Sequence, residues 1–331
     1  RNQQSIGVYS MPINQKSQAK FALGFIGSGR IARRHAAALA EIAAVEIHAW
    51  SAGNFSNAEA SAAEYGGTAM QTDSLLADPN IHAVLICSPT HLHQEHIHKA
   101  LRSGKKIFCE KPITRHLHEI DDIIEAGRQH LYIGHVLRFF HAYNRARQII
   151  QRGDLGKIQH VVCKRLGRKK TDSTTWMLKP ELSGGVLLDL AIHDFDWLLW
   201  TFGEANELGL KIDPEKDPHG WLHAITQLSW QDGLKATVES SWLNDVFETG
   251  LFVEGEQGTL SVDPGHPDEI VLKSIQYERA IPLTGLPDPY KMQMKHFVGW
   301  LNGLLDPIVT LDEARAALAL SLRAIDAKPG T

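Results

Sequence analysis

The chain is poor in cysteine, and the cysteines it has are far apart. Only three occur, Cys87, Cys109 and Cys163, and their odd number and wide spacing suit a reducing compartment better than a disulfide framework. No apolar stretch approaches the roughly 20 residues that a membrane-spanning helix requires. The formal net charge of -4 leaves no basic surface for nucleic acid. We therefore expect a cytoplasmic protein with neither a membrane nor a nucleic acid as partner.

The composition is otherwise that of a globular chain, and 331 residues suffice for about two domains. Residues 1–20 are polar and lack the apolar centre of a secretory signal. We expect this segment to be a flexible arm or an artificial extension, separate from the fold. The first domain is then expected over residues 21–137 and the second over residues 138–331.

In the first domain, apolar strand-like runs alternate with amphipathic helical segments. The predicted strands are Ala22–Ile26, Val45–Trp50, Ala83–Cys87, Lys106–Cys109 and Leu131–Gly134, and the predicted helices include Ile31–Ala43, Ala58–Tyr65, Leu92–Ser103 and Ile120–Gln129. This alternation is typical of a doubly wound parallel sheet with helices on both faces. The domain is therefore predicted to have a Rossmann fold.

In the second domain the rhythm changes to strands joined by short turns, after a helix over Arg145–Arg152. The predicted strands are Ile158–Arg165, Leu222–Trp230, Leu234–Ser241, Gly250–Glu254, Gly258–Val262 and Glu269–Ile275. They indicate an α+β domain with a large, mostly antiparallel open sheet. We expect helices Gly185–Thr201 and Tyr290–Leu304 beside this sheet, whereas the last helix, Leu311–Ala327, could pack on either domain.

A glycine turn separates the first predicted strand from the first predicted helix. Gly27 allows the tight turn, Gly29 lets the backbone approach a phosphate, and the small Ala32 allows close packing of helix and strand. The exposed N–H groups of the first helical turn favour an anion. The turn, which includes Ser28, Arg30 and Ile31, is therefore predicted to bind the pyrophosphate of a dinucleotide.

Two further loops follow predicted parallel strands. One contains Ser88, Pro89, Thr90 and His93, and the other contains Glu110, Lys111 and Pro112. Ligands of a doubly wound sheet lie at the carboxyl ends of its strands, so both loops are expected to face the cofactor. Lys111 is then expected near the nicotinamide.

The third segment whose side chains could take part in the chemistry is the apolar helix predicted over Gly185–Thr201. Asp189 and His193 are four residues apart and would share one helix face, with Asp196 one turn further on. Histidine is suited to accept the proton of an alcohol that is oxidised near neutral pH. We expect Asp194 on the helix surface and Asp196 as a structural hydrogen-bonding partner.

Together, the glycine turn, Glu110-Lys111-Pro112 and the segment from Gly184 to Asp196 resemble the Gfo/Idh/MocA family, named for glucose-fructose oxidoreductase and inositol 2-dehydrogenase. The resemblance implies an NAD(P)-dependent oxidoreductase that acts on a secondary hydroxyl or ketone of a sugar or cyclic polyol. It further implies that Lys111 bonds the reacting oxygen, that His193 is the acid/base and that Asp189 binds a neighbouring hydroxyl.

The resemblance also implies a cis peptide before Pro112 and a cofactor-side position for His93. It places Arg138 and Tyr143 among substrate-side residues. Two other classes share the fold and stay open: an NAD-dependent glycosidase, and a non-catalytic sensor of a sugar or dinucleotide. The broad open sheet of the second domain suggests a homo-oligomer formed through that sheet.

The end of the second predicted strand bears on the choice of cofactor. Many NAD-preferring Rossmann enzymes carry a carboxylate there for the ribose 2′-hydroxyl, whereas this chain has Ser51, Ala52, Gly53 and Asn54. Ser51 and Asn54 could bond a 2′-phosphate and Arg30 could supply a positive charge. We therefore expect NADP rather than NAD.

Two clusters of charged or titratable side chains receive plainer interpretations. The histidines His91, His93, His96 and His98 would point in several directions on a helix, so no metal is expected. The basic run at residues 168–170 is expected to be a solvated loop, although it could meet an anionic group on the substrate.

Overall fold

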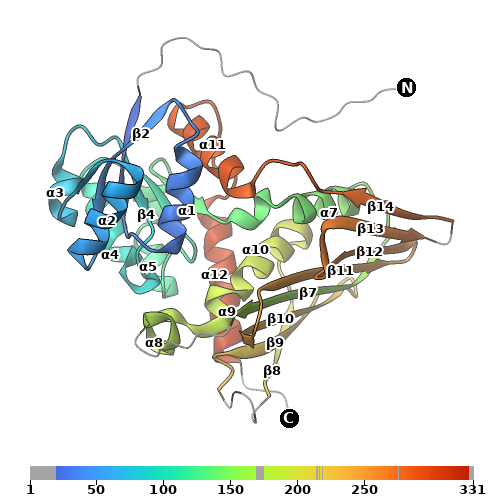
Figure 1. The fold of residues 1–331 in the computed structure, drawn as a ribbon. Coiled ribbons are helices and arrows are strands. Elements are labelled where there is room, and N and C mark those ends of the chain that lie inside the picture. Colours follow the sequence, from blue (N-terminus) through green and yellow to red (C-terminus); the bar gives the residue numbers. More distant parts are fainter. Residues whose placement is uncertain are drawn as a thin grey trace.

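The computed structural model describes residues 20–168, 175–213, 215, 217, 219–274 and 276–327 (Figure 1). The predicted arm, apart from Lys20, lies outside the described residues. So do Lys169 and Lys170 of the basic run. Within the described residues the chain forms two sheets, which lie at opposite ends of the molecule with helices between them.

The first sheet is parallel and has six strands in the order β3-β2-β1-β4-β5-β6. The strands are β1 (Phe21–Ile26), β2 (Val45–Ser51), β3 (Thr68–Ala69), β4 (Ala83–Ile86), β5 (Lys106–Glu110) and β6 (Leu131–Gly134). Alternate side chains of a strand enter two separate cores. In β5, Ile107 packs on one face of the sheet and Phe108 on the other. The predicted doubly wound Rossmann sheet is confirmed.

Helices cover both faces of this sheet. They are α1 (Arg30–Leu39), α2 (Phe55–Tyr65), α3 (Thr72–Ala77), α4 (His93–Arg102), α5 (Leu117–Asp121) and α6 (Ile124–Gly127), with short 3-10 turns η1 (Thr90–Leu92) and η2 (Val136–Phe139). The single helix predicted over Ile120–Gln129 is wrong, because the chain breaks there into α5 and α6.

The second sheet has eight strands in the order β14-β13-β12-β11-β7-β10-β9-β8. The strands are β7 (Ile158–Arg168), β8 (Glu207–Lys211), β9 (His223–Ser229), β10 (Lys235–Asn244), β11 (Glu248–Gly255), β12 (Gly258–Asp263), β13 (His266–Ser274) and β14 (Glu278–Pro282). Only β7 and β10 pair in parallel, and every other pair is antiparallel. The prediction of a large, mostly antiparallel sheet is confirmed, although the sequence did not reveal β8 and β14.

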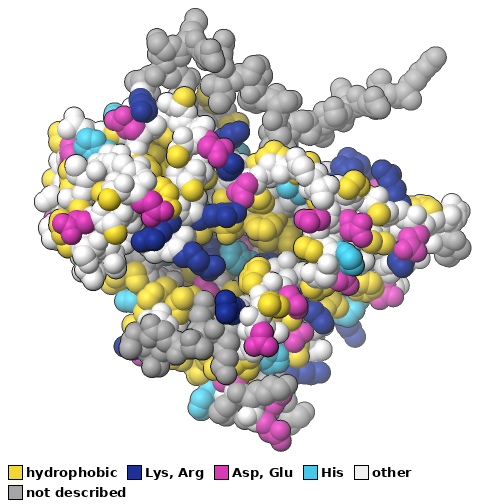
Figure 2. All heavy atoms as spheres, in the orientation of Figure 1, with side chains coloured by type: hydrophobic (Ala, Val, Ile, Leu, Met, Phe, Trp, Pro, Cys, Tyr) yellow, Lys and Arg dark blue, Asp and Glu magenta, His cyan; other side chains and the backbone are white. Residues whose placement is uncertain are grey.

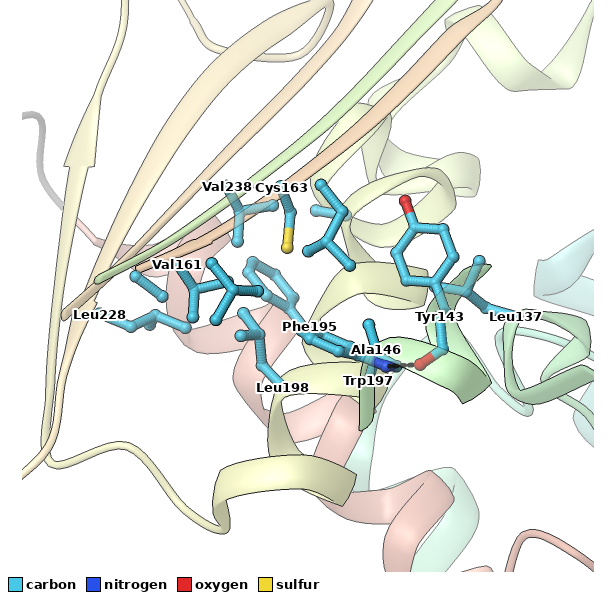
Figure 3. Close-up of a cluster of buried hydrophobic side chains, with 14 of the residues drawn as sticks. Leu137, Tyr143, Ala146, Val161, Cys163, Phe195, Trp197, Leu198, Leu228 and Val238 are labelled. Carbon is cyan, nitrogen blue, oxygen red and sulfur yellow. Dashed lines mark hydrogen bonds between the residues drawn. The ribbon is translucent and has the colours of Figure 1, made fainter. Parts of the chain in front are cut away.

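One face of this sheet packs on helices α7 (His141–Gln151) and α10 (Ala191–Phe202). Figure 3 shows Val161 and Val238 of the sheet facing Phe195 and Leu198 of α10, with Trp197 beside them. Three short helical segments, η3 (Trp176–Leu178), α8 (Pro180–Ser183) and α9 (Gly185–Asp189), precede α10. The sheet thereby holds α9 and α10 towards the first domain (Figure 1).

The last two helices cross back to the first domain. Helix α11 (Pro289–Leu301) packs on α1, and its Met294 and Phe297 belong to a core of the parallel sheet. The expectation that this helix lies beside the second sheet is therefore wrong. Helix α12 (Leu311–Asp326) contacts α9 and α10 and also α5, α6 and β6. It packs on both domains and ties them together.

Candidate active site

The glycine turn lies between β1 and α1. Gly27 has a φ of +108°, and a Cβ there would lie 2.5 Å from the carbonyl carbon of Cys87. A Cβ on Gly29, by contrast, would meet no described atom within 4 Å. Gly29 is the N-cap of α1 and gives the helix no side-chain cap. The turn therefore leaves open space in front of the N–H groups that begin α1, which suits an anion.

Glu110 fixes the loop after β5 and is nearly shut off from solvent. Its carboxylate contacts His35 of α1 at 2.6 Å and accepts the backbone N–H of Lys111 at 3.1 Å. It is 6% exposed. We therefore assign Glu110 to positioning Lys111 rather than to direct cofactor contact. The peptide between Lys111 and Pro112 is cis.

His93 lies between the two loops that are expected to face the cofactor and forms hydrogen bonds to both. Its ring nitrogens lie 2.8 Å from the carbonyl oxygens of Ser88 and Pro112, and the residue is 1% exposed. Thr90 is also buried, whereas Ser88 and Pro89 are partly exposed. The structure thus gives His93 the role of holding both loops in place, and its predicted place on the cofactor side stays a prediction.

Lys111 and Asp189 meet between the two domains. The Lys111 ammonium donates to the Asp189 carboxylate at 3.0 Å and to the Asp189 carbonyl oxygen at 2.7 Å. Their side chains are 13% and 20% exposed. Figure 2 shows a hollow between the domains with Lys, Arg and His side chains along it. The structure therefore brings together two of the predicted site residues that lie far apart in the sequence.

The helix that was predicted to carry Asp189 and His193 is two helices. Asp189 ends α9, Leu190 has φ -100° and ψ -54°, and His193 lies in the first turn of α10. In a continuous helix the Asp189 carbonyl would accept the N–H of His193. Here the Asp189 carbonyl accepts a hydrogen bond from the Lys111 ammonium instead. The His193 N–H donates to the Leu190 carbonyl at 3.2 Å. The predicted unbroken helix is therefore wrong: Leu190 interrupts it, and the Asp189 carbonyl bonds Lys111 in place of the His193 N–H.

His193 is held in its neutral form. Burial lowers its pKa well below the usual value, and the positive charges of Lys111, Arg165 and His135 lower it further. Its Nδ1 is buried and has no hydrogen-bond partner among the described residues. A neutral imidazole beside an ammonium group can accept a proton from a hydroxyl that the ammonium also bonds.

Arg138 is part of a buried ion-pair network. Its guanidinium donates to the carboxylate of Asp196 at 2.9 and 2.7 Å, and also to Ile308 and Glu313. It is 1% exposed. Its donors are used inside the protein, so the structure gives Arg138 a structural role in place of the substrate contact that the resemblance implied. Asp196 is confirmed as a structural partner.

Tyr143 and Asp194 also lie in the interior. Asp194 is fully buried and accepts Arg165 at 2.9 Å from two nitrogens, so its predicted surface position is wrong. Tyr143 is 3% exposed, its ring packs edge-on against Trp197, and burial raises the pKa of its hydroxyl. Figure 3 shows Tyr143 within the core, where its carbonyl accepts the Trp197 N–H. The structure therefore gives Tyr143 a place in the core in place of the substrate contact that the resemblance implied.

At the end of β2 only part of the predicted phosphate-binding set is available. Ser51 is 1% exposed, and its hydroxyl bonds that of Thr72 at 2.5 Å. Its hydroxyl is therefore engaged within the protein, and its contact with a 2′-phosphate stays a prediction. Asn54 is exposed and caps α2 by accepting the N–H of Ser56 at 3.1 Å. Arg30 is exposed beside the glycine turn.

Sequence reasoning missed three residues near the site: His35, His135 and Arg165. Each is buried and faces a charged partner that is distant in sequence. A clue was available only for Arg165, a charged residue at a core position of a strand. Among the described residues, no group of three or more His, Cys, Asp or Glu side chains is placed to hold a metal ion.

Two sequence profiles match the chain, one for each domain. Residues 21–136 match an oxidoreductase family with an NAD-binding Rossmann fold, and residues 143–261 match the Gfo/Idh/MocA C-terminal domain. The chain belongs to the Gfo/Idh/MocA family of oxidoreductases. In the part of the chain that the structure describes, no helix combines the length and apolar character needed to cross a membrane.

Among its relatives is a myo-inositol 2-dehydrogenase of Thermotoga maritima, 27% identical over 319 residues, which cover 91% of this chain and 94% of the relative. A 2,7-anhydro-N-acetylneuraminate hydratase of Mediterraneibacter gnavus is 33% identical over 201 residues, covering 58% of this chain and 54% of that protein. The solved structure of UDP-N-acetylglucosamine 3-dehydrogenase from Acidithiobacillus ferrooxidans has a TM-score of 0.78, 23% identity and coverage of 93% and 97%. That last likeness concerns the fold alone.

Proposed function

We propose that this oxidoreductase transfers a hydride between a nicotinamide cofactor and a secondary hydroxyl or ketone of a sugar or cyclic polyol. The observation that carries the proposal is the bond between Lys111 of one domain and Asp189 of the other, beside the neutral His193. The inositol dehydrogenases among its relatives support the substrate class.

The residues of the first domain fit a dinucleotide. The open space at Gly29 and the uncapped start of α1 would hold the pyrophosphate, with Arg30 beside it. We propose NADP over NAD, because no carboxylate follows β2 to repel a 2′-phosphate. Asn54 is exposed after β2, and Arg30 is exposed at the start of α1. When bound, the nicotinamide would supply the hydride acceptor or donor.

The chain's own residues would then handle the oxygen and its proton. In oxidation, His193 accepts the hydroxyl proton, which its lowered pKa permits even in mildly acidic solution. Lys111 exchanges its bond to the Asp189 carboxylate for one to the reacting oxygen and stabilises the negative charge that develops there. Asp189, thereby freed, accepts a neighbouring hydroxyl of the substrate and orients the ring.

The test is the absorbance of reduced nicotinamide when the purified protein meets a panel of inositols, hexoses and anhydro sugars with NAD or NADP. We expect turnover on at least one member, faster with NADP. The same panel is run with His193→Asn, which should lose activity, and with His141→Asn, which alters an exposed histidine bond to Pro287 and should not. Equal rates for parent and His193→Asn would contradict the proposal.

A second candidate is a reaction without net redox change, as an NAD-dependent glycosidase of this fold would carry out. The hydratase among the relatives supports this second candidate. It is more similar to this chain than the inositol dehydrogenase is, although over a shorter stretch. If this second candidate is right, chromatography should detect a product while no reduced cofactor accumulates. A sensor predicts binding without product, and the geometry around His193 disfavours that outcome.

We also propose a homo-oligomer through the second sheet. The β10–β11 connection exposes Val246 and Phe247, at 58% and 61%, and Phe252 of β11 is 36% exposed. Such apolar groups at the sheet surface suit an isologous contact. Sedimentation should give a mass above 36.8 kDa, and Phe247→Lys should lower it.

A further inference from the structure

His135 is an enclosed histidine at the edge of the candidate site. It follows β6, at the carboxyl edge of the parallel sheet, and is 1% exposed. Both of its ring nitrogens are buried, and neither has a hydrogen-bond partner among the described residues. Its Nδ1 lies 3.8 Å from the Asp196 carboxylate, too far for a hydrogen bond. Buried polar atoms normally have a partner, so this imidazole requires an explanation.

His135 lies against the helix that carries the proposed acid/base. Asp196 and His193 are three residues apart on α10 and therefore neighbours on one face of it. The segment that follows His135, η2, packs on α10 as well. The Nδ1 of His193 is also buried without a described partner. His135 and His193 thus both lie close to Asp196, each has a buried ring nitrogen without a described partner, and the charge of a protonated His135 acts on His193.

The charges around His135 suit a group that takes up a proton briefly. Burial lowers its pKa, Asp196 and Glu110 raise it, and Arg138 and Lys111 lower it. It is therefore neutral near pH 7 and has a free lone pair. Burial alone would raise the pKa of the Asp196 carboxyl. The nearby His135 and Arg138 lower that pKa, and the carboxylate stays ionised. An imidazolium at His135 would face this negative charge.

We propose, on the basis of the proposed function, that His135 relays the substrate proton away from His193 through one bound water. The hydroxyl proton would bond to Nε2 of His193, and a bound nicotinamide would supply the acceptor for the hydride of the same carbon. The Nδ1 proton of His193 then passes to the water, and a proton of the water passes to His135. No further oxidant or reductant is needed. His135 does not touch substrate and is a positioning residue.

The test has a readout that needs no substrate. Nitrogen NMR titrates the imidazoles of the apoprotein for the parent, His135→Gln and His135→Phe, and His193→Asn identifies the His193 signal by its loss. Because a protonated His135 lowers the pKa of His193, we expect both His135 variants to raise that pKa. The control is His296→Gln, which removes a half-buried histidine bonded to Tyr132 and should leave the His193 titration unchanged. An unchanged His193 titration in both His135 variants would overturn the relay.

The kinetic arm uses the substrate found in the panel, with NADP. His135→Gln keeps a polar amide but cannot relay a proton, so kcat should fall on the order of 10-fold while KM and cofactor Kd stay unchanged. The solvent deuterium isotope effect on kcat should rise as proton release becomes slower. A merely structural role predicts unchanged kcat with a lowered Tm. If no substrate turns over, the proposed function fails, and the NMR titration still decides whether the two histidines are coupled.

Discussion

Replacing Arg138 by methionine should destabilise the protein strongly. The guanidinium makes four hydrogen bonds of 2.7–3.0 Å, two of them to the Asp196 carboxylate, and both partners are 1% exposed. Methionine retains much of the volume but leaves a buried, unpaired carboxylate. Breaking one side of such a pair costs about 3–5 kcal/mol, which is about a hundredfold to a few thousandfold in the folding equilibrium.

The assay is urea unfolding followed by tryptophan fluorescence, since Arg138 lies 4.9 Å from the ring of Trp200. The matched control is Arg147→Met. The Arg147 guanidinium lies 4.0 Å from the same ring, but among the described residues it bonds just the Trp200 carbonyl and Gln151. It should cost about 1 kcal/mol or less. If Arg138→Met were as stable as the control and instead raised KM, the structural role assigned to Arg138 would be refuted and a substrate role restored.

Three further outcomes are expected. Gly29→Val should lower dinucleotide affinity at least 10-fold by calorimetry with little change in Tm, because its side chain enters open space, whereas Gly27→Ala should lower Tm because its Cβ meets Cys87. Ala52→Asp should reverse a preference for NADP by repelling the 2′-phosphate, and tighter NAD binding by the parent would refute that preference. Burial lowers the pKa of His96 to about 4, below its unfolded value of about 6.5, so the folded state binds fewer protons between these values. Stability should therefore fall as the pH falls from about 7 to 5. A Tm that rises as the pH falls from about 7 to 5 would contradict the lowered pKa of His96.

The parts of the site that depend on local chain geometry were accessible from the sequence. Gly27 and Gly29 lie where a strand, a turn and a helix follow each other, and Lys111 directly follows a strand end. In such positions the main-chain path fixes where the residue lies. Strand alternation was equally visible, because burial on both faces of a parallel sheet demands continuous apolar runs.

The parts that depend on tertiary contacts were not accessible. At the break at Leu190, the Asp189 carbonyl accepts a hydrogen bond from Lys111 of the other domain, a partner that the local sequence does not show. Ser51 was expected at a 2′-phosphate because its hydroxyl can bond one, and Tyr143 was expected near the substrate from the family resemblance. Packing buries both side chains and gives their hydroxyls partners within the protein. A polar residue type does not show whether its partner is a substrate or another part of the chain.

The account's central claim is that Lys111 and His193 act on the same oxygen of one substrate. The most direct measurement is the rate of hydride transfer in single turnovers for the parent, Lys111→Met, His193→Asn and the double variant, with cofactor Kd measured for each. Each single change should lower the rate on the order of 100-fold or more, and the double variant should lose much less than the product of the two losses, because each group acts on charge that the other helps to develop. Losses that multiply fully, or a near-parental rate for His193→Asn, would contradict the claim.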